Sequence, residues 1–318
     1  MKKKLLSKFS VKRISSSPYF SKDFSTLEQE TIYNLTGSDM LPLNSNELAS
    51  VLITNTHTDL ATISEEQLEM CQLMIHPNSG YDNFPAEFVS KVKFPIVIGN
   101  PIRANAVANY ILSALLSHYS AIPNEMTWNE ERKWPRRLLS ELNILILGYG
   151  HIGSILRESL VPLVAGVRIF DPFAGFPNLD LHNIDVLIPI CSLNIKNRSM
   201  VNKAMLLELK EDFLLINAAR GSLVDTEDLL NVLTIRPDAS AVLDVFEKEP
   251  ADFSQFSQIK NIFLSSHLAG VYKKIDLTTA NFEAQTIFDF MKMENFEFEN
   301  KYKTMILKNR LQGQNFLI

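Results

Sequence analysis

Short apolar runs alternate with helix-like segments along this chain, a pattern typical of parallel sheets joined by crossover helices. A helix is predicted from Ser25 or Thr26 to Gly37, and Ser64-Glu-Glu-Gln67 has the form of a capping box that opens another helix. Buried strands are predicted at residues 51–54, 73–76 and 96–98, and further on at 144–147, 167–170, 186–188, 213–217, 239–243 and 262–264.

Residues 101–120 form a longer helical pattern that is apolar on more than one side, which predicts a helix buried between domains or subunits. The tail after Ala269 is also helical in pattern. The six strands of the second half, separated mostly by helix-length segments, indicate a doubly wound nucleotide-binding domain. The length of 318 residues suits two domains.

Composition narrows the class of protein. A formal net charge of −5 argues against nucleic acid as the main partner, and no stretch approaches the length of a membrane span. Cys71 and Cys191 lack metal-ligand spacing and are expected to be buried free thiols, so we expect no metal and a cytoplasmic location. The basic start lacks the apolar region of a signal peptide and is either an interaction arm or, as we favour, a solvated terminus. Its charges are Lys2, Lys3, Lys4, Lys8, Lys12 and Arg13.

The segment after strand 144–147 carries Gly148-Tyr-Gly150-His-Ile-Gly153 and leads into a helical pattern. Gly148 permits the tight turn, Gly150 lets the backbone approach a pyrophosphate, and Gly153 lets the helix pack on the strand. The helix N-terminus then directs amide donors at the phosphates. Asp171, beyond the next strand, either caps a turn or accepts the ribose hydroxyls of NAD and repels a 2′-phosphate. No Arg or Lys follows it directly, so NAD is the predicted cofactor.

Arg220, Glu249 and His267 each lie just past a predicted strand, at spacings of 29 and 18 residues. Because the carboxyl ends of parallel strands converge on the ligand crevice, these side chains are expected to meet around a nicotinamide ring. Their segments resemble the signature regions of the D-isomer-specific 2-hydroxyacid dehydrogenases, a likeness that covers roughly residues 50 to 290. Ser79-Gly-Tyr-Asp-Asn83 is similar to the family's substrate loop, and Ala106-Val-Ala108 to the start of its interdomain helix.

The resemblance implies a role for each of these residues. His267 would be the acid/base, since an imidazole exchanges a proton near neutral pH, and Glu249 would orient it and stabilise its protonated form. Arg220 would bind the substrate carboxylate and carbonyl with its forked donors, and the amides of Ser79 and Gly80 would bind the remaining carboxylate oxygen. The implied cofactor contacts are Gly148, Tyr149, Gly150, His151, Ile152, Gly153, Asp171, Ala218, Arg220, Asp244 and His267, with Asp244 at the nicotinamide carboxamide.

The fold that this resemblance implies is α/β, with two doubly wound parallel-sheet domains and a cleft between them. The Rossmann-type cofactor domain would span residues 101–269, and the flavodoxin-like substrate domain residues 1–100 and 270–318. The implied activity is hydride transfer between NAD(H) and a small D-2-hydroxy acid or its 2-keto acid. A homodimer is expected from the apolar character of residues 101–120.

Other interpretations remain open. The same fold serves NAD(H)-binding corepressors, and the fold alone does not separate a regulator from an enzyme. A formate dehydrogenase is the third possibility, which Glu249 disfavours because those enzymes usually carry Gln there. Taken singly, Arg220 could pair with Asp225, His267 could cap a strand, and His76 could be either a packed histidine or a substrate contact. The chain departs from the family pattern at Asn109, Cys191–Asn194 and residues 1–48.

Overall fold

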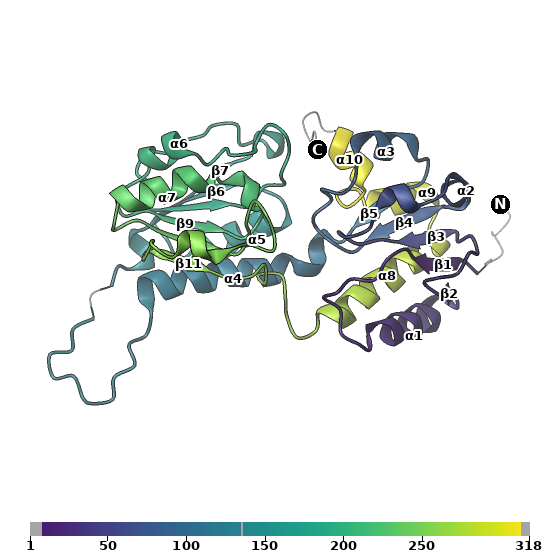
Figure 1. Ribbon diagram of the computed structural model, residues 1–318, viewed down its shortest axis with the longest axis horizontal. Coiled ribbons are helices and arrows are strands. Elements are labelled where there is room, and N and C mark those ends of the chain that lie inside the picture. The colour runs from purple at the N-terminus through teal and green to yellow at the C-terminus, as the bar shows by residue number, and fades with distance from the viewer. Residues whose placement is uncertain (1–7, 135, 313–318) are drawn as a thin grey trace. The chain divides into compact units, whose positions relative to one another are not determined.

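Two parallel sheets organise the chain in a computed structural model that describes residues 8–134 and 136–312 (Figure 1). The chain divides into two compact units. The first comprises the described residues of Met1–Arg103 and Tyr272–Ile318, and the second those of Ala104–Val271. Each unit has its own sheet and its own buried core.

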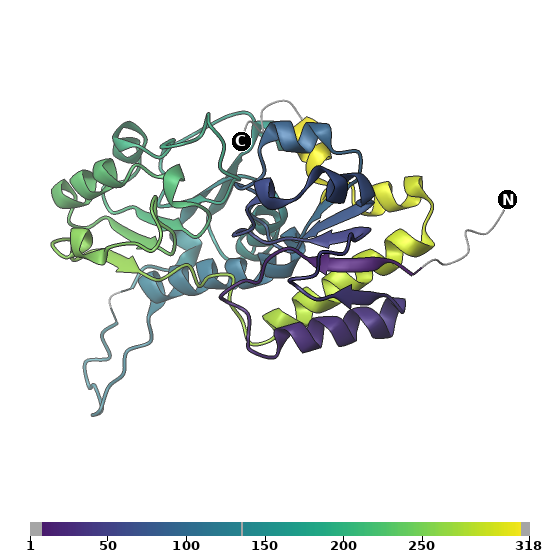
Figure 2. The same cartoon turned by 45° about the vertical axis from the view of Figure 1, so that its right-hand side comes forward.

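The sheet of the first unit has five parallel strands in the order β2-β1-β3-β4-β5, which is the flavodoxin-like order. Helices cover both of its faces because alternate side chains of each strand point to opposite sides. Val51 and Ile53 pack towards α1 and α8, which lie side by side (Figure 1, Figure 2), whereas Leu52 packs towards α3 and α10. The elements are β1 (Ser10–Arg13), α1 (Phe24–Thr36), β2 (Asp39–Leu41), β3 (Val51–Ile53), α2 (Glu65–Met70), β4 (Leu73–His76), α3 (Ala86–Lys91), β5 (Ile96–Ile98), α8 (Ile275–Lys292), α9 (Asn295–Lys301) and α10 (Leu307–Gln312).

Local capping fixes the ends of two predicted helices. Gly37 ends α1 in the left-handed conformation, at φ 68°, and its amide donates to the carbonyl of Tyr33. The Ser64 hydroxyl begins α2 by accepting from the Gln67 amide at 3.2 Å. The prediction of a full capping box is wrong, because the second hydrogen bond, from the Ser64 amide to the Gln67 side chain, is not formed. The Gln67 side chain instead pairs with the Ala49 backbone at 2.7 and 3.0 Å.

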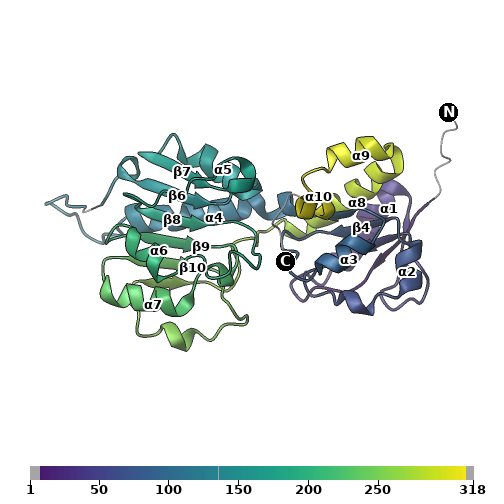
Figure 3. The same cartoon turned by 90° about the horizontal axis from the view of Figure 1, so that it is seen from above.

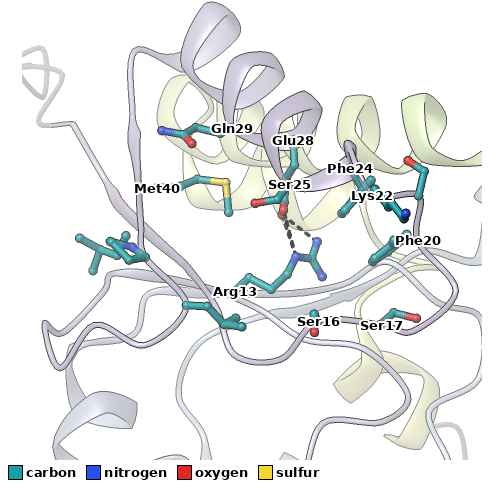
Figure 4. Close-up of a pocket in the computed structure, with 14 residues that line it drawn as sticks. Arg13, Ser16, Ser17, Phe20, Lys22, Phe24, Ser25, Glu28, Gln29 and Met40 are labelled. Carbon is teal, nitrogen blue, oxygen red and sulfur yellow. Dashed lines mark hydrogen bonds and ion pairs between the residues drawn. The ribbon is translucent and has the colours of Figure 1, made fainter.

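Strand β1 corrects the interpretation of the basic start as a solvated terminus. It pairs with β2 on one side and β3 on the other, and Arg13 at its end is only 6% exposed. The Arg13 guanidinium donates to Glu28 of α1 at 2.7 Å (Figure 4) and to Glu283 of α8 at 2.6 Å. These two carboxylates offset the loss of hydration of the buried cation. Lys8 is exposed, Lys12 is half-buried, and Lys2, Lys3 and Lys4 lie outside the described residues.

The sheet of the second unit has six parallel strands in the order β11-β10-β9-β8-β6-β7, a doubly wound, Rossmann-like arrangement whose order reverses between β6 and β8. Helices α4 and α5 pack on one face and α6 and α7 on the other (Figure 3). The elements are α4 (Asn100–Ser120), β6 (Asn143–Leu147), α5 (His151–Leu160), β7 (Gly166–Phe170), β8 (Val186–Pro189), α6 (Lys203–Glu208), β9 (Leu214–Asn217), α7 (Thr226–Ile235), β10 (Ser240–Leu243) and β11 (Ile262–Leu264).

The long helix α4 is confirmed, but the reason given for its apolar character needs correction. Its side chains Val107, Ala108, Ile111 and Leu115 are buried in the core of the second unit itself. Its exposed face is mostly polar, with Leu116 as the large apolar side chain among the exposed positions. The apolar pattern of α4 is therefore explained by packing within one unit and is no argument for a subunit interface.

Candidate active site

The glycine loop between β6 and α5 has two glycines that the protein's own packing requires. Gly148 has φ 111°, and a Cβ there would lie 2.7 Å from the Cys191 backbone. A Cβ at Gly153 would lie 2.3 Å from the Gly148 carbonyl oxygen, so α5 could not pack so closely on the loop. A Cβ at Gly150 would meet no protein atom within 4 Å. The space beside Gly150 is open, as a bound pyrophosphate requires.

The N-terminus of α5 lies at this open space. Gly150 is its N-cap, and no side chain caps the helix there, so the positive end of the helix dipole faces this space. Tyr149, His151 and Ile152 are half-buried around the same turn. The loop and helix therefore fit the pyrophosphate of a dinucleotide.

Asp171 follows β7 and performs the turn-capping role while also contacting the glycine loop. Its Oδ1 accepts from the amides of Phe173 and Ala174 at 3.1 and 3.2 Å, which caps the short helix Pro172–Ala174. Its Oδ2 accepts from the Tyr149 amide at 2.7 Å. Oδ2 keeps a further acceptor site, and the group is held at the edge of the glycine loop. Capping and ribose recognition are therefore compatible.

Glu249 and His267 form a hydrogen-bonded pair, with 2.6 Å between Glu249 Oε2 and His267 Nδ1. The other carboxylate oxygen of Glu249 accepts from the Phe246 amide at 3.0 Å, which fixes the carboxylate. Nδ1–H of His267 is therefore the donor to Glu249, and Nε2 has no hydrogen-bond partner among the described residues. The His267 side chain is 52% exposed, so a substrate could reach Nε2. His267 also has φ 53°, an uncommon backbone conformation for a non-glycine residue.

Asp244 holds the loop that carries His267. Its carboxylate accepts from the Ser265 hydroxyl at 2.6 Å and from the amides of Leu268 and Ala269 at 2.9 and 2.8 Å. Its carbonyl accepts from the His267 amide at 2.7 Å. Asp244 is fully buried, so its carboxylate has no exposed surface here for the expected nicotinamide contact, which stays a prediction.

Arg220 lies just after β9, beside the loop that carries Glu249. Its Nη1 donates to the Ala219 carbonyl at 2.7 Å, and its own carbonyl accepts from Asn217 at 3.0 Å. The next residue, Gly221, touches the backbone after β10, since a Cβ there would lie 1.9 Å from the Phe246 carbonyl carbon. Arg220 is half-buried, and Ala218 before it is buried. Of the predicted residues, Glu249 and His267 are in contact, and Arg220 follows β9, a strand that pairs with β10 in the same sheet.

The predicted substrate loop belongs to the first unit and is held by His76, the last residue of β4. His76 is fully buried, with Nε2 2.8 Å from the Gly80 carbonyl and Nδ1 2.9 Å from the Thr54 hydroxyl. A carbonyl can only accept, so Nε2 carries the proton and Nδ1 accepts from Thr54. Burial lowers the pKa of His76 to about 4. His76 is therefore a packed histidine that holds the substrate loop through the Gly80 carbonyl.

The amides of Ser79 and Gly80 point to no protein acceptor within the part of the chain that the structure describes. Ser79 is half-buried and Gly80 is buried. Buried amides are nearly always hydrogen-bonded in folded proteins, so two consecutive amides without an acceptor indicate a place for a ligand oxygen.

A cavity of about 500 Å³ lies at the ends of β1 and β2, beside the start of α1 (Figure 4). Its lining includes the ion-paired Arg13 and Glu28 and the side chains of Phe20, Phe24 and Met40. No sequence motif signals it, because its lining comes from the first 48 residues, which resemble the family poorly. No predicted site residue lies in it.

The described residues bear on the expectations about membrane spans, metal ligands and cysteines. No helix in this part of the chain is long and apolar enough to cross a membrane. No group of three His, Cys, Asp or Glu side chains within it is arranged to hold a metal ion. Both cysteines are unpaired; Cys71 is buried as predicted, whereas Cys191 is half-buried.

A doubly wound sheet with an open glycine loop at its order reversal defines a dinucleotide-binding protein. The family model described as the NAD binding domain of D-isomer specific 2-hydroxyacid dehydrogenases matches residues 112–269. An erythronate-4-phosphate dehydrogenase of Wigglesworthia glossinidia brevipalpis is 28% identical over 204 residues, 60% of this chain and 50% of that protein. A D-3-phosphoglycerate dehydrogenase of Bacillus subtilis is 26% identical over 235 residues, 67% of this chain and 44% of that protein. The chain belongs to the D-isomer-specific 2-hydroxyacid dehydrogenase family.

Solved structures agree in fold. A 3-phosphoglycerate dehydrogenase of Entamoeba histolytica with bound NAD+ superposes with a TM-score of 0.68 at 16% identity, over 95% of this chain and 99% of that one. The chain spans about half the length of the first curated relatives that it matches. The family model identifies the second unit as an NAD-binding domain.

The buried His76 predicts a pH-dependent stability. Its pKa is about 4 in the folded protein against an ordinary 6.5, so the unfolded chain binds more protons between these values and stability rises with pH there. We expect the contribution of His76 to fall by about 3 kcal/mol between pH 7 and pH 4. Urea unfolding across this range should show that His76→Gln loses most of this pH dependence.

The exposed His57 provides the matched control. His57→Gln removes a histidine from the same unit and should keep the parental slope of unfolding free energy against pH. If His76→Gln and His57→Gln give the same slope, His76 is not held neutral in the folded protein.

Proposed function

We propose that this protein is an NAD-dependent dehydrogenase that interconverts a small D-2-hydroxy acid and its 2-keto acid. The observation that carries the proposal is the Glu249–His267 pair, 2.6 Å apart and exposed at strand ends of an NAD-binding domain. A histidine with a purely structural role would not need an exposed ring nitrogen without a hydrogen-bond partner. The pair therefore supports an enzyme over a regulator that only binds NAD(H).

His267 Nε2 is the atom that gives a proton to the keto oxygen during reduction and takes it back from the hydroxyl during oxidation. Glu249 orients the ring through Nδ1 and stabilises its protonated form by charge. Bound NADH supplies the hydride. The loop from Gly148 to Gly153, with Asp171, would hold the cofactor, and Ala218 and Arg220 would contact it.

Recognition of the acid rests on two groups of donors. Arg220 presents forked donors suited to a carboxylate and its neighbouring carbonyl. In the first unit, the amides of Ser79 and Gly80, which have no protein acceptor among the described residues, are two further donors suited to a carboxylate oxygen. Asn109, a departure from the family pattern, is exposed on α4 and has no role in this scheme.

Substitution of the acid/base separates chemistry from binding. His267→Asn keeps a polar side chain that cannot exchange a proton near neutral pH, so turnover should fall roughly 10²–10⁴-fold. NADH affinity should barely change, because the glycine loop and Asp171 are intact. NADH oxidation with 2-keto acids such as pyruvate, glyoxylate and hydroxypyruvate, together with NADH fluorescence titration, measures both quantities.

Glu249→Gln is the graded control for this experiment. The amide oxygen can still accept from Nδ1–H, but the negative charge is lost, so turnover should fall by less than in His267→Asn. Near-parental turnover of His267→Asn would contradict the assignment of the acid/base.

The cofactor preference is expected to follow Asp171. In the parent, kcat/KM with NADH should exceed kcat/KM with NADPH for the same keto acid, because the carboxylate binds ribose hydroxyls and repels a 2′-phosphate. Asp171→Asn keeps an oxygen for the turn-capping bonds and removes the charge, so this preference should fall by about tenfold or more. An equal loss with both cofactors would show that Asp171 only caps the turn.

We also propose a homodimer. The proposal is based on residues 121–134, a loop that projects from the second unit after α4 and is called the arm (Figure 1). The arm exposes Ile122, Met126 and Trp128, at 87%, 90% and 81%. Its base is fixed, since the Arg137 guanidinium lies 5.7 Å from the Tyr119 ring centroid and 2.6 Å from the buried carboxylate of Asp185. Large apolar side chains on an anchored arm favour a protein partner, for which a second copy is the simplest candidate.

Trp128→Ser tests the dimer. Loss of a tryptophan anchor of about 2 kcal/mol should raise the dimer dissociation constant by about 30-fold or more. Sedimentation velocity over a micromolar concentration series measures it. Ile235→Ser, at an apolar side chain that is 62% exposed at the end of α7, should leave the constant unchanged. A parental protein that is monomeric at micromolar concentration would contradict the proposal.

A cytoplasmic location is part of the same proposal. The two unpaired cysteines support it, because a reducing compartment keeps thiols free. Burial raises the pKa of Cys71 to about 12, which keeps that thiol protonated and unreactive.

A further inference from the structure

Arg103, in the first turn of α4, contacts the substrate loop directly. Its Nη1 donates to the Pro77 carbonyl at 2.9 Å, and Pro77 is its only hydrogen-bond acceptor among the described residues. Two residues further along the loop come the amides of Ser79 and Gly80, which have no protein acceptor there. A guanidinium and two free amides therefore belong to one short stretch of the first unit.

The charge of Arg103 is poorly compensated for its degree of burial. Burial lowers the pKa of Arg103, and the attraction of Asp276 and Glu283 offsets this only in part. No carboxylate of the described residues forms an ion pair with it. Arg13 in the same unit is compensated in the usual way, because its guanidinium forms ion pairs with the carboxylates of Glu28 and Glu283 at 2.7 and 2.6 Å. A guanidinium kept in such surroundings without a counterion is a mark of a site where a ligand brings the negative charge.

We propose that Arg103 binds a second anionic group of the substrate, a carboxylate or a phosphate at the end opposite the carboxylate that the Ser79 and Gly80 amides hold. This inference rests on the proposed function and narrows its substrate class to 2-hydroxy and 2-keto acids with two anionic groups, called dianionic acids for short. The geometry suits small acids: Pro77 and Ser79 are two residues apart, so their Cα atoms lie within about 8 Å of each other. We therefore expect an acid of three to five carbon atoms.

Matched pairs of keto acids test the proposal. 3-Phosphohydroxypyruvate differs from hydroxypyruvate by a phosphate, and oxaloacetate differs from pyruvate by a carboxylate. In the parent, kcat/KM should favour the dianionic member of at least one pair, and that pair identifies the anionic group. Arg103→Gln keeps a donor for the Pro77 carbonyl and removes the charge. It should lower this preference about 10- to 100-fold, mainly through KM, because a charge-assisted hydrogen bond is lost.

Lys91→Gln is the matched control, since it removes one exposed positive charge from the same unit and should leave the preference unchanged. Arg103→Lys should restore part of the preference, which a purely structural role for Arg103 would not predict. A parent without preference in either pair, or an equal loss for both members in Arg103→Gln, would overturn the proposal.

A binding measurement keeps this inference separate from the proposed function. Calorimetric titration with 3-phospho-D-glycerate against D-glycerate, and with D-malate against D-lactate, needs no turnover. If no keto acid oxidises NADH but Arg103→Gln weakens binding of a dianionic acid about 10-fold or more, the proposed activity fails and the anion site stands. If turnover occurs and neither dianionic acid binds more tightly to the parent than to Arg103→Gln, the anion site fails and the activity stands.

Discussion

The position of the acid/base histidine depends on the buried carboxylate of Asp244. Three donors from residues 265–269 converge on it, and its carbonyl accepts from the His267 amide. Such a carboxylate must be satisfied in full when water is excluded, so the chain after β11 has to bend back over it. The bend places His267 at φ 53° with its ring towards Glu249. The Tyr110 hydroxyl, 2.7 Å from that of Ser265, links the same network to α4. The His267 imidazole is thus held in place by the Asp244 side chain, by the ends of β10 and β11, and by α4 through Tyr110.

Close backbone contacts impose a second constraint, which explains why particular glycines occur in this chain. Gly153 lets α5 approach the glycine loop, and Gly221 lets the segment after β9 touch the segment after β10. The first contact aims a helix N-terminus at the space beside Gly150. The second brings the backbone of Arg220 next to the loop that carries Glu249. Neither glycine needs a left-handed conformation; each is needed because another piece of backbone occupies the place of a Cβ.

The sequence was sufficient for elements with strong local signals and for residues that follow them directly. The strands of the second unit, α1, α4, the glycine loop and the pairing of Glu249 with His267 follow from apolar runs, glycine spacing and family-like segments. Strand β1 could not be predicted from the sequence, because its four residues include Lys12 and Arg13. The carboxylates that allow Arg13 to be buried lie 15 and 270 positions away in the sequence. The roles of Thr54 beneath His76 and of Arg103 beside Pro77 are likewise set by distant contacts. No local pattern signals such contacts.

The distribution of satisfied and unsatisfied polar groups separates the scaffold from the chemistry. Asp244, His76 and the Arg13 guanidinium are deeply buried and bonded to named partners, and each of them fixes a segment of backbone. Among the residues of the proposed site, unused capacity remains at His267 Nε2, at the Ser79 and Gly80 amides and on the open side of Gly150. An unsatisfied buried donor is unfavourable in the isolated protein, so the folding energy alone gives no reason to keep it. The buried Gly80 amide becomes favourable when a ligand supplies the missing acceptor. The same reasoning distinguishes Arg103 from Arg13: both guanidinium groups are withdrawn from solvent, but only Arg13 has carboxylates against it.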